Sequence, residues 1–237
     1  MRRTLIAVLT LLLIFSISDT ARAADVVIVD RIISPEYGGL VYVVDKIRIL
    51  DNSSFRFGVV EEMHDRLVAF SVDGGDYKLI GKITGGTYIY EIYPQSREVT
   101  IKAIYRGLIR EAGGNNYELV INAEPLIEGR IVQANILLPT TSYIRYPAAP
   151  SGWVLTEKGL EKKNITISGN GLREPIIIRF MSSGLALIQV ESLDVGYSMS
   201  ESSVVLSMKI ENLAGNPLRQ LDLKMPDGID VKEVRDT

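Results

Sequence analysis

Apolar and polar residues alternate at a period of two along most of the chain after residue 24, and no segment there shows a convincing helical period. In residues 98–105, for example, every odd position is apolar and most even positions are polar. A β-strand sends successive side chains to opposite faces, so such a segment has one face for a core and one for water. The same alternation recurs in residues 117–122, 132–138, 204–211 and 221–225. The chain is therefore predicted to be all-β.

Three other runs, residues 40–44, 88–93 and 176–180, are largely apolar at both odd and even positions. They are predicted to be central strands, or strands covered by a neighbouring domain. Glycine- and asparagine-rich turns such as Asp73-Gly74-Gly75-Asp76 separate the predicted strands. Short strands joined by close turns favour antiparallel sandwiches, and the lack of helices between strands disfavours a parallel α/β sheet.

The first 23 residues have the three parts of a secretory signal peptide. Arg2 and Arg3 form a positive start, residues 5–17 are an apolar run without charge, and Ala21-Arg22-Ala23 closes the segment with small residues. The apolar run has 13 residues, short of the roughly 20 that span a bilayer comfortably as a helix. The expectation is cleavage after Ala23, with an uncleaved N-terminal anchor as the alternative. Either way the chain is predicted to be secreted or part of the cell envelope.

Composition shifts suggest three parts after the signal segment. One boundary is expected at Glu124-Pro125, where the first set of strands ends in a charged turn, and another within residues 192–203, which are rich in Ser, Glu, Asp and Gly. The expected domains are residues 24–124, residues 125–195 and a partial module at 196–237. Because two or three strands leave one apolar face open, this last piece is expected either to pack on the preceding domain or to be followed by a continuation of the natural protein past Thr237, with an anchor as one option.

A family resemblance occurs near the end of the sequence, over about 30 residues. The motifs that carry it are Met208-Lys209-Ile210-Glu211-Asn212, Gly215-Asn216-Pro217-Leu218 and the strand and Pro-x-Gly turn of residues 221–228. This pattern resembles the Ig-like modules repeated in exported prokaryotic, archaeal-type surface and adhesion proteins. The resemblance implies tandem antiparallel Ig-like β-sandwich domains after the signal peptide, and it carries over no functional residue.

Composition excludes several kinds of chemistry. The chain has no Cys and one His, which excludes disulfides, thiolate zinc sites, cysteine nucleophiles and His-rich metal sites. With 26 Lys+Arg against 29 Asp+Glu, it lacks the basic excess that nucleic-acid phosphates require. We therefore predict no metal, no cofactor and no nucleic-acid partner.

No catalytic residue stands out. His64 lies in a charged connection between two predicted strands, and no Gly-x-Ser-x-Gly motif supplies a nucleophile for it. Asp73 and Asp76 are interpreted as flanks of a hairpin turn rather than calcium ligands, because the EF-hand spacing is absent. The chain is predicted not to be an enzyme. Five residues are candidates for the paired carboxylates of a hydrolase, and none of them stands out: Glu61, Glu62, Glu91, Glu111 and Glu118.

Residues 139–153 form the most suggestive loop. It contains three prolines and four residues of the kind that make strong binding contacts, namely Tyr143, Arg145, Tyr146 and Trp153. We predict these four as binding residues, the alternative being that their rings fasten the loop onto the core. Two sequons, Asn52-Ser53-Ser54 and Asn164-Ile165-Thr166, predict glycosylation at Asn52 and Asn164.

The leading hypothesis is a non-enzymatic extracytoplasmic protein of the cell surface or envelope, serving structure, adhesion or recognition. Its expected partners are other envelope proteins or surface glycans, with self-association as a further option. Contact with the membrane is expected only through an uncleaved signal segment or a C-terminal anchor. Two alternatives are an exported carboxylate-based hydrolase with an interdomain site, and a self-assembling filament subunit that donates its N-terminal strand, residues 25–33.

Overall fold

The computed structural model describes residues 26–50, 53–83, 85–168, 174–198 and 203–212. Nearly all of these residues lie in strands, and the four-residue α2 (Glu61–His64) is the only helix among them. The prediction of an all-β chain is confirmed. None of the helices in these ranges is long and apolar enough to cross a membrane.

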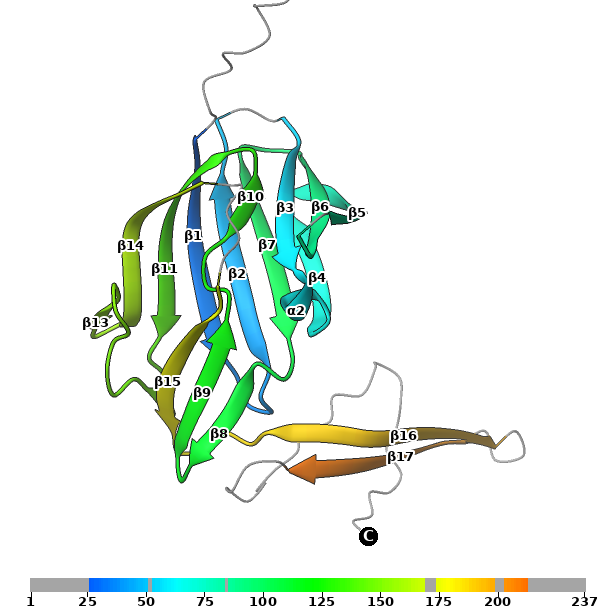
Figure 1. The fold of residues 1–237 in the computed structure, drawn as a ribbon. Helices are drawn as coiled ribbons and strands as arrows, with labels where there is room; N and C mark the ends of the chain where they lie inside the picture. Colours follow the sequence, from blue (N-terminus) through cyan, green and yellow to red (C-terminus); the bar gives the residue numbers. More distant parts are fainter. Residues whose placement is uncertain (1–25, 51–52, 84, 169–173, 199–202, 213–237) are drawn as a thin grey trace, which may run out of the picture.

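A seven-stranded sheet forms one layer (Figure 1). Its strands lie in the order β13 (Val154–Thr156), β14 (Gly159–Ser168), β11 (Ile131–Pro139), β1 (Val26–Pro35), β2 (Val41–Arg48), β7 (Glu98–Tyr105) and β4 (Leu67–Asp73). All neighbours are antiparallel except β1 and β11, which run parallel with Val29 opposite Ala134. The first described strand of the chain is therefore an interior strand.

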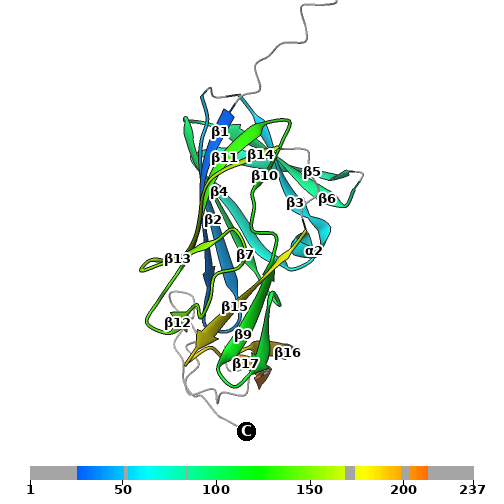
Figure 2. The ribbon, with the colours of Figure 1, turned by 60° about the vertical axis from the view of Figure 1, so that its left-hand side comes forward.

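Two four-stranded sheets form the other layer (Figure 2). One has the order β10 (Leu126–Glu128), β3 (Phe55–Val60), β6 (Thr87–Pro94), β5 (Gly75–Ile83). The other has the order β12 (Ile144–Arg145), β15 (Ile176–Ser182), β9 (Asn116–Ile121), β8 (Ile109–Gly113). The two views place both on the same side of the seven-stranded sheet, one beyond the other along its length.

One continuous core fills the space between the layers. Its buried side chains come from all three sheets, for example Val29 on β1, Ile92 on β6 and Phe180 on β15. The runs predicted to be central strands fall on β2, β6 and β15, each of which has a neighbour on both sides. The boundary expected at Glu124-Pro125 falls in the link between β9 and β10, and strands from before and after it pair as β1 and β11 in one sheet.

The last two described strands form a separate hairpin, β16 (Ile188–Ser198) and β17 (Ser203–Asn212). A parallel bridge between Gly38 and Leu187 joins its base to the sandwich, and the hairpin extends away from the end where β8 and β9 lie (Figure 1). The signal segment at residues 1–23 and the segment 221–228, which carries part of the Ig-like resemblance, lie outside the described residues.

A candidate binding pocket between the sheets

A small, half-open cavity lies where the seven-stranded sheet faces the β10–β3–β6–β5 sheet, and its free volume is about 40 Å³. A water molecule needs roughly 10–15 Å³ of such space. The cavity therefore has room for about three waters, or for the tip of a ligand of similar size. Twelve residues line it: Arg31, Val43, Phe57, Gly58, Val59, Val60, Met63, Thr87, Tyr105, Asn122, Glu124 and Leu126.

Three structural elements make the walls of the pocket. The seven-stranded sheet supplies Arg31 and Tyr105, and α2 closes one end with the buried side chain of Met63. The opposite wall is β3, where position 58 is glycine and β10 packs closely against it. A Cβ at Gly58 would lie 2.4 Å from a methyl carbon of Leu126, so a larger residue here would require the Leu126 side chain to move.

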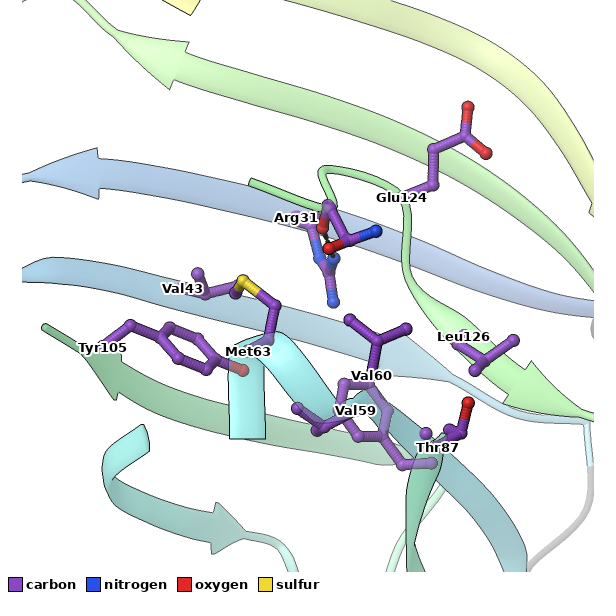
Figure 3. A pocket seen from close by; sticks show the side chains of 12 residues that line it. Arg31, Val43, Val59, Val60, Met63, Thr87, Tyr105, Glu124 and Leu126 are labelled. Carbon is purple, nitrogen blue, oxygen red and sulfur yellow. Dashed lines mark hydrogen bonds between the residues drawn. The ribbon is translucent and has the colours of Figure 1, made fainter. Parts of the chain in front are cut away.

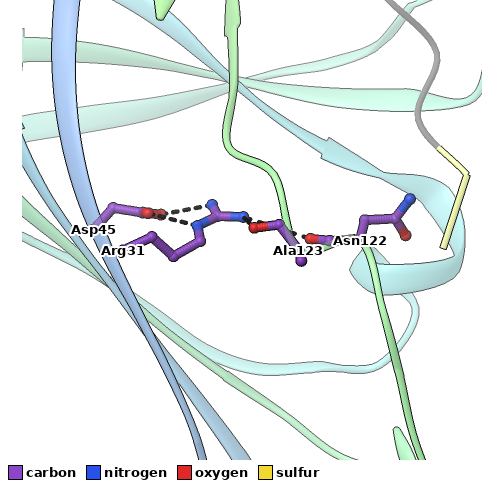
Figure 4. Close-up of polar contacts among 4 residues, drawn as sticks. All are labelled: Arg31, Asp45, Asn122 and Ala123. Atoms are coloured by element: carbon purple, nitrogen blue, oxygen red, sulfur yellow. Dashed lines mark hydrogen bonds and ion pairs between the residues drawn. The ribbon is translucent and has the colours of Figure 1, made fainter. Parts of the chain in front are cut away.

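Arg31 and Asp45 form an ion pair inside the core beside the pocket (Figure 4). They lie directly opposite each other on β1 and β2, and Arg31 donates from Nε and Nη2 to the two Asp45 carboxylate oxygens at 2.6 and 2.7 Å. Its Nη1 donates to the carbonyl of Ala123 at 3.1 Å, in the link between β9 and β10. Burial acts to lower the pKa of Arg31, but the charge and hydrogen bonds of Asp45 outweigh burial and raise it. The guanidinium therefore stays charged and joins the two layers.

Tyr105 brings a hydroxyl group into the same pocket. Its side chain is only 4% exposed, and the hydroxyl points in among the lining side chains (Figure 3). It has no hydrogen-bond partner among the residues that the structure describes, although buried polar groups in proteins are nearly always paired. Burial raises the pKa of Tyr105, with a smaller opposing effect from the Arg31 charge. The phenol is therefore protonated at neutral pH and has a proton to donate.

The pocket combines an apolar lining, one available phenol donor and no net charge from its buried ion pair. At its rim, Glu124 accepts a hydrogen bond from Lys162 Nζ at 2.8 Å. Concave, mostly apolar sites with a few converging polar groups are typical of small-ligand sites. The chemistry that fits is a small neutral group with an acceptor oxygen for the Tyr105 hydroxyl.

The four residues predicted as binding residues do not share one surface, and none of them lines the pocket. Tyr146 and Trp153 are buried in the core, so their rings fasten the loop 139–153 to it. Arg145 is exposed. Tyr143 is half-buried, stacks on Tyr37 with ring centroids 4.1 Å apart, and donates to Glu36 Oε2 at 3.1 Å. A binding role stays a prediction for this loop, and Tyr143 and Arg145 are its accessible members.

The structure describes the asparagine of one of the two sequons. Asn52 lies outside the described residues. Asn164 is exposed on β14 with φ of 53°, opposite a register shift in β11, and its backbone N–H donates to Asn135 Oδ1 at 3.1 Å. The side-chain amide of Asn164 is therefore presented to solvent, and its glycosylation stays a prediction.

Most of the candidate catalytic residues make structural contacts. His64 stacks on Tyr88 with ring centroids 3.6 Å apart. Asp73 pairs with Lys102 at 2.5 Å, next to the β4–β5 turn where Gly74 has φ of 79°. Among the carboxylates, Glu61 pairs with Lys82, Glu91 accepts from the Tyr93 hydroxyl, and Glu118 pairs with Arg110 and Arg179. Within the described ranges no group of three or more His, Asp or Glu side chains is placed to hold a metal ion.

The filament alternative relied on a free N-terminal strand. Both edges of β1 are already hydrogen-bonded inside the chain, to β2 on one side and to β11 on the other. A strand in this position has no open edge to donate to a neighbouring subunit, so that use of the strand does not agree with the fold.

Arg31, Asp45 and Tyr105 were missed by sequence analysis, although a signal for the first two is present. Arg31 stands in phase with Val29 and Ile33, and Asp45 in phase with Val43, so each charge occupies a position where the alternation expects a core residue. Two opposite charges out of place on adjacent predicted strands indicate a buried pair. Nothing local to the sequence places Tyr105 beside them.

We expect Tyr143 to ionise at about pH 12, because burial and the neighbouring Glu36 carboxylate raise the pKa of its phenol to about 12 from an ordinary value of 10.0. A raised folded-state pKa favours the protonated phenol. The protonated phenol of Tyr143 therefore stabilises the folded state, and this stabilisation is full below pH 10 and is lost as the pH rises toward 12. Tyrosine ring carbon shifts followed by NMR against pH measure it, with Tyr143→Phe to assign the signal. Glu36→Gln should lower this pKa, and an unchanged value would contradict the role given to Glu36.

No family model matches the chain, and no curated protein sequence matches it. Some solved structures resemble parts of it at low similarity. An aminopeptidase N family protein from Idiomarina loihiensis matches 77% of this chain and 32% of its own length, with 8% identity and a TM-score of 0.43. Yeast LTA4 hydrolase, in complex with Bestatin, matches 73% of this chain and 29% of its own, with 10% identity and a TM-score of 0.32.

A GH20 exo-β-N-acetylglucosaminidase from Vibrio harveyi matches 52% of this chain and 20% of its own, with 13% identity and a TM-score of 0.26. This chain thus spans a third or less of the length of these solved chains. At such TM-scores the likeness assigns no activity to it. The hypothesis of a non-enzymatic surface protein for structure, adhesion or recognition finds no support in these matches, whose names are those of an aminopeptidase N family protein and a hydrolase, and it is withdrawn.

Proposed function

We propose that this chain binds a small neutral molecule in the pocket between its sheets, and that the Tyr105 hydroxyl donates a hydrogen bond to an acceptor oxygen of that molecule. The observation that carries the proposal is the buried Tyr105 hydroxyl, which meets no hydrogen-bond partner among the described residues and lines a half-open cavity. The cavity of about 40 Å³ takes only the tip of the ligand, a group such as a short amide or ketone, while the rest lies outside.

The electrostatics of the pocket favour a neutral ligand over a charged one. The positive charge of Arg31 is already met by both oxygens of Asp45, so an anion would gain little from Arg31 and would be repelled by Asp45. A cation would meet the same guanidinium. Burying an unpaired charge costs far more free energy than burying a hydrogen-bonded amide or carbonyl.

The proposed role is ligand binding, and its place is outside the cytoplasm. A general base has to accept a proton near neutral pH, whereas burial raises the pKa of Tyr105 and keeps its proton on. Export is supported by the positive start, apolar run and small-residue end of residues 2–23. An Ig-like character of the C-terminal region belongs to the same proposal and is supported by the motifs in residues 208–228.

Acetamide and acetone are suitable probes, because each is a small neutral group with one carbonyl acceptor. A tip of about three heavy atoms gains at most about 1.5 kcal/mol per atom, so its dissociation constant is expected to be about 0.5 mM or higher. We expect titration with acetamide to shift the NMR methyl signals of Val43, Val59 and Met63. Tyr105→Phe should weaken this binding about tenfold, since a lost hydrogen bond costs about 1–1.5 kcal/mol.

Tyr146→Phe is the matched control, because this phenol is also buried but donates to the Pro139 carbonyl away from the pocket. It should leave the acetamide affinity unchanged. Methyl shifts spread over the whole core, or equal affinities for the two Phe variants, would overturn the proposal.

A further inference from the structure

The outer face of the β12–β15–β9–β8 sheet carries more positive than negative charge. Paired residues of antiparallel strands share a face, so Glu118 on β9 lies on the same face as Arg110 on β8 and Arg179 on β15. Arg145 on β12 belongs to this face too, because it pairs with Met181, two residues along β15 from Arg179. The face therefore has three arginines, all exposed, against one glutamate.

The fifth charged residue of these four strands, Glu111, does not offset this charge. It lies opposite Tyr117, whose side chain is buried in the core, so Glu111 belongs to the inner side of the sheet. The outer face of the β10–β3–β6–β5 sheet is different, because there Arg56 lies between Glu91 and Glu128. A surplus of arginine is therefore a property of one sheet and not of both.

Glu118 holds two of the arginines side by side. Arg110 donates from Nε to Glu118 Oε2 at 2.9 Å, and Arg179 donates from Nε to Oε1 at 3.1 Å. These hydrogen bonds hold the pKa of the Glu118 carboxyl below its usual value, so one negative charge is shared by two positive ones. The terminal amino groups of Arg179 and the whole Arg145 guanidinium have no partner among the residues that the structure describes. A guanidinium in this state can bind a second carboxylate through two parallel hydrogen bonds.

Apolar side chains lie between the arginines on the same face. Ile177 and Met181 flank Arg179 at a spacing of two residues along β15, and they are 50% and 44% exposed. Arg and Met are enriched at protein–protein interfaces. An acidic sugar chain would meet the arginines but would place hydroxyl groups against these two apolar side chains. The combination therefore favours an acidic polypeptide as the partner.

We propose that the outer face of the β12–β15–β9–β8 sheet docks an acidic polypeptide segment. Its carboxylates bind Arg145 and Arg179, and its apolar side chains cover Ile177 and Met181. An extended segment matches the spacing, because every second residue of it faces the sheet at the same interval as alternate residues of β15. The proposal is independent of the pocket and its ligand, which lie on the inner side of the other sheet.

An NMR titration of the whole chain tests the proposal. The probe is the acetylated and amidated peptide Leu-Ser-Glu-Ser-Leu-Ser-Glu, which presents leucine and glutamate alternately on one face. We expect saturable shifts of the backbone amides in β12 and β15. Arg179→Gln should weaken binding about fivefold, the upper end for an exposed ion pair. Arg56→Gln is the matched control, because Arg56 is also exposed and paired with a glutamate, Glu128, and it should leave the affinity unchanged.

Two further probes distinguish a polypeptide from other acidic partners. Replacing both leucines of the peptide with serine should weaken binding at least fivefold, because the contacts with Ile177 and Met181 are lost. A sulfated hexasaccharide should bind more weakly than the peptide. Equal binding of the leucine-free peptide, tighter binding of the hexasaccharide, or equal effects of Arg179→Gln and Arg56→Gln would overturn the proposal. So would the absence of shifts in β12 and β15.

Discussion

Replacing Arg31 with methionine is expected to lower the free energy of unfolding by about 3–5 kcal/mol, because Asp45 then stays buried without its partner. Asp45 is 1% exposed, and both of its carboxylate oxygens accept hydrogen bonds from Arg31. The Ala123 carbonyl also loses its donor. Urea denaturation followed by circular dichroism measures the change. The NMR signals of the residues that line the Tyr105 pocket show whether the structure changes locally.

Two further variants separate the buried pair from a general effect of removing an arginine. Arg48 and Asp30 lie on the same two strands but on the outer face, 3.7 Å apart and about half exposed. Arg48→Met should change the free energy of unfolding by less than about 1 kcal/mol, as for most surface ion pairs. The double variant Arg31→Met with Asp45→Val removes both charges and should recover most of the loss. Equal losses for Arg31→Met and Arg48→Met would contradict a special role for the buried pair.

Strand content was accessible to sequence analysis because the period of two is a local property. The segment at residues 98–105 coincides with β7. The three runs that are apolar at both odd and even positions fall on β2, β6 and β15, which are interior strands. Strand partners are not a local property. Nothing near residue 29 shows that β1 pairs in parallel with β11, about a hundred residues later. Such pairing depends on which faces fit together in three dimensions, and this is why strands were predicted more securely than their arrangement.

The candidate site was harder to predict, because it is assembled from segments far apart in the chain. Loop 139–153 attracted attention by its aromatic residues, yet Tyr146 and Trp153 are core residues. A large ring is as useful for fastening a loop as for binding a ligand, and composition does not distinguish the two uses. The charges at Arg31 and Asp45 were better signals, since each breaks an apolar phase. Their meaning depends on β1 and β2 being neighbours with these two residues in register.

Gly159→Ala is expected to be nearly as destabilising as the loss of Arg31, for a steric reason. Gly159 begins β14 opposite Pro139, with φ of 137°. A Cβ at this position would lie 1.9 Å from the Leu138 carbonyl oxygen and 2.8 Å from the Thr140 nitrogen, both of them backbone atoms. Backbone cannot move aside as a flexible side chain does, so β11 and β14 must separate locally. We expect a loss of at least about 3 kcal/mol, from steric overlap and backbone strain together.

Gly81→Ala measures the strain alone. Gly81 on β5 has a φ of 135°, close to that of Gly159, but a Cβ there would have no atom within 4 Å. Its cost should be about 1–3 kcal/mol, the ordinary penalty for a residue held in a sparsely populated backbone region. The difference between the two alanine variants, measured by denaturant unfolding, therefore reports the close approach of β11 to β14. A Gly159→Ala chain that does not fold beside a folded Gly81→Ala chain agrees with this expectation, whereas equal losses would show that the β11–β14 end relaxes to accept a side chain.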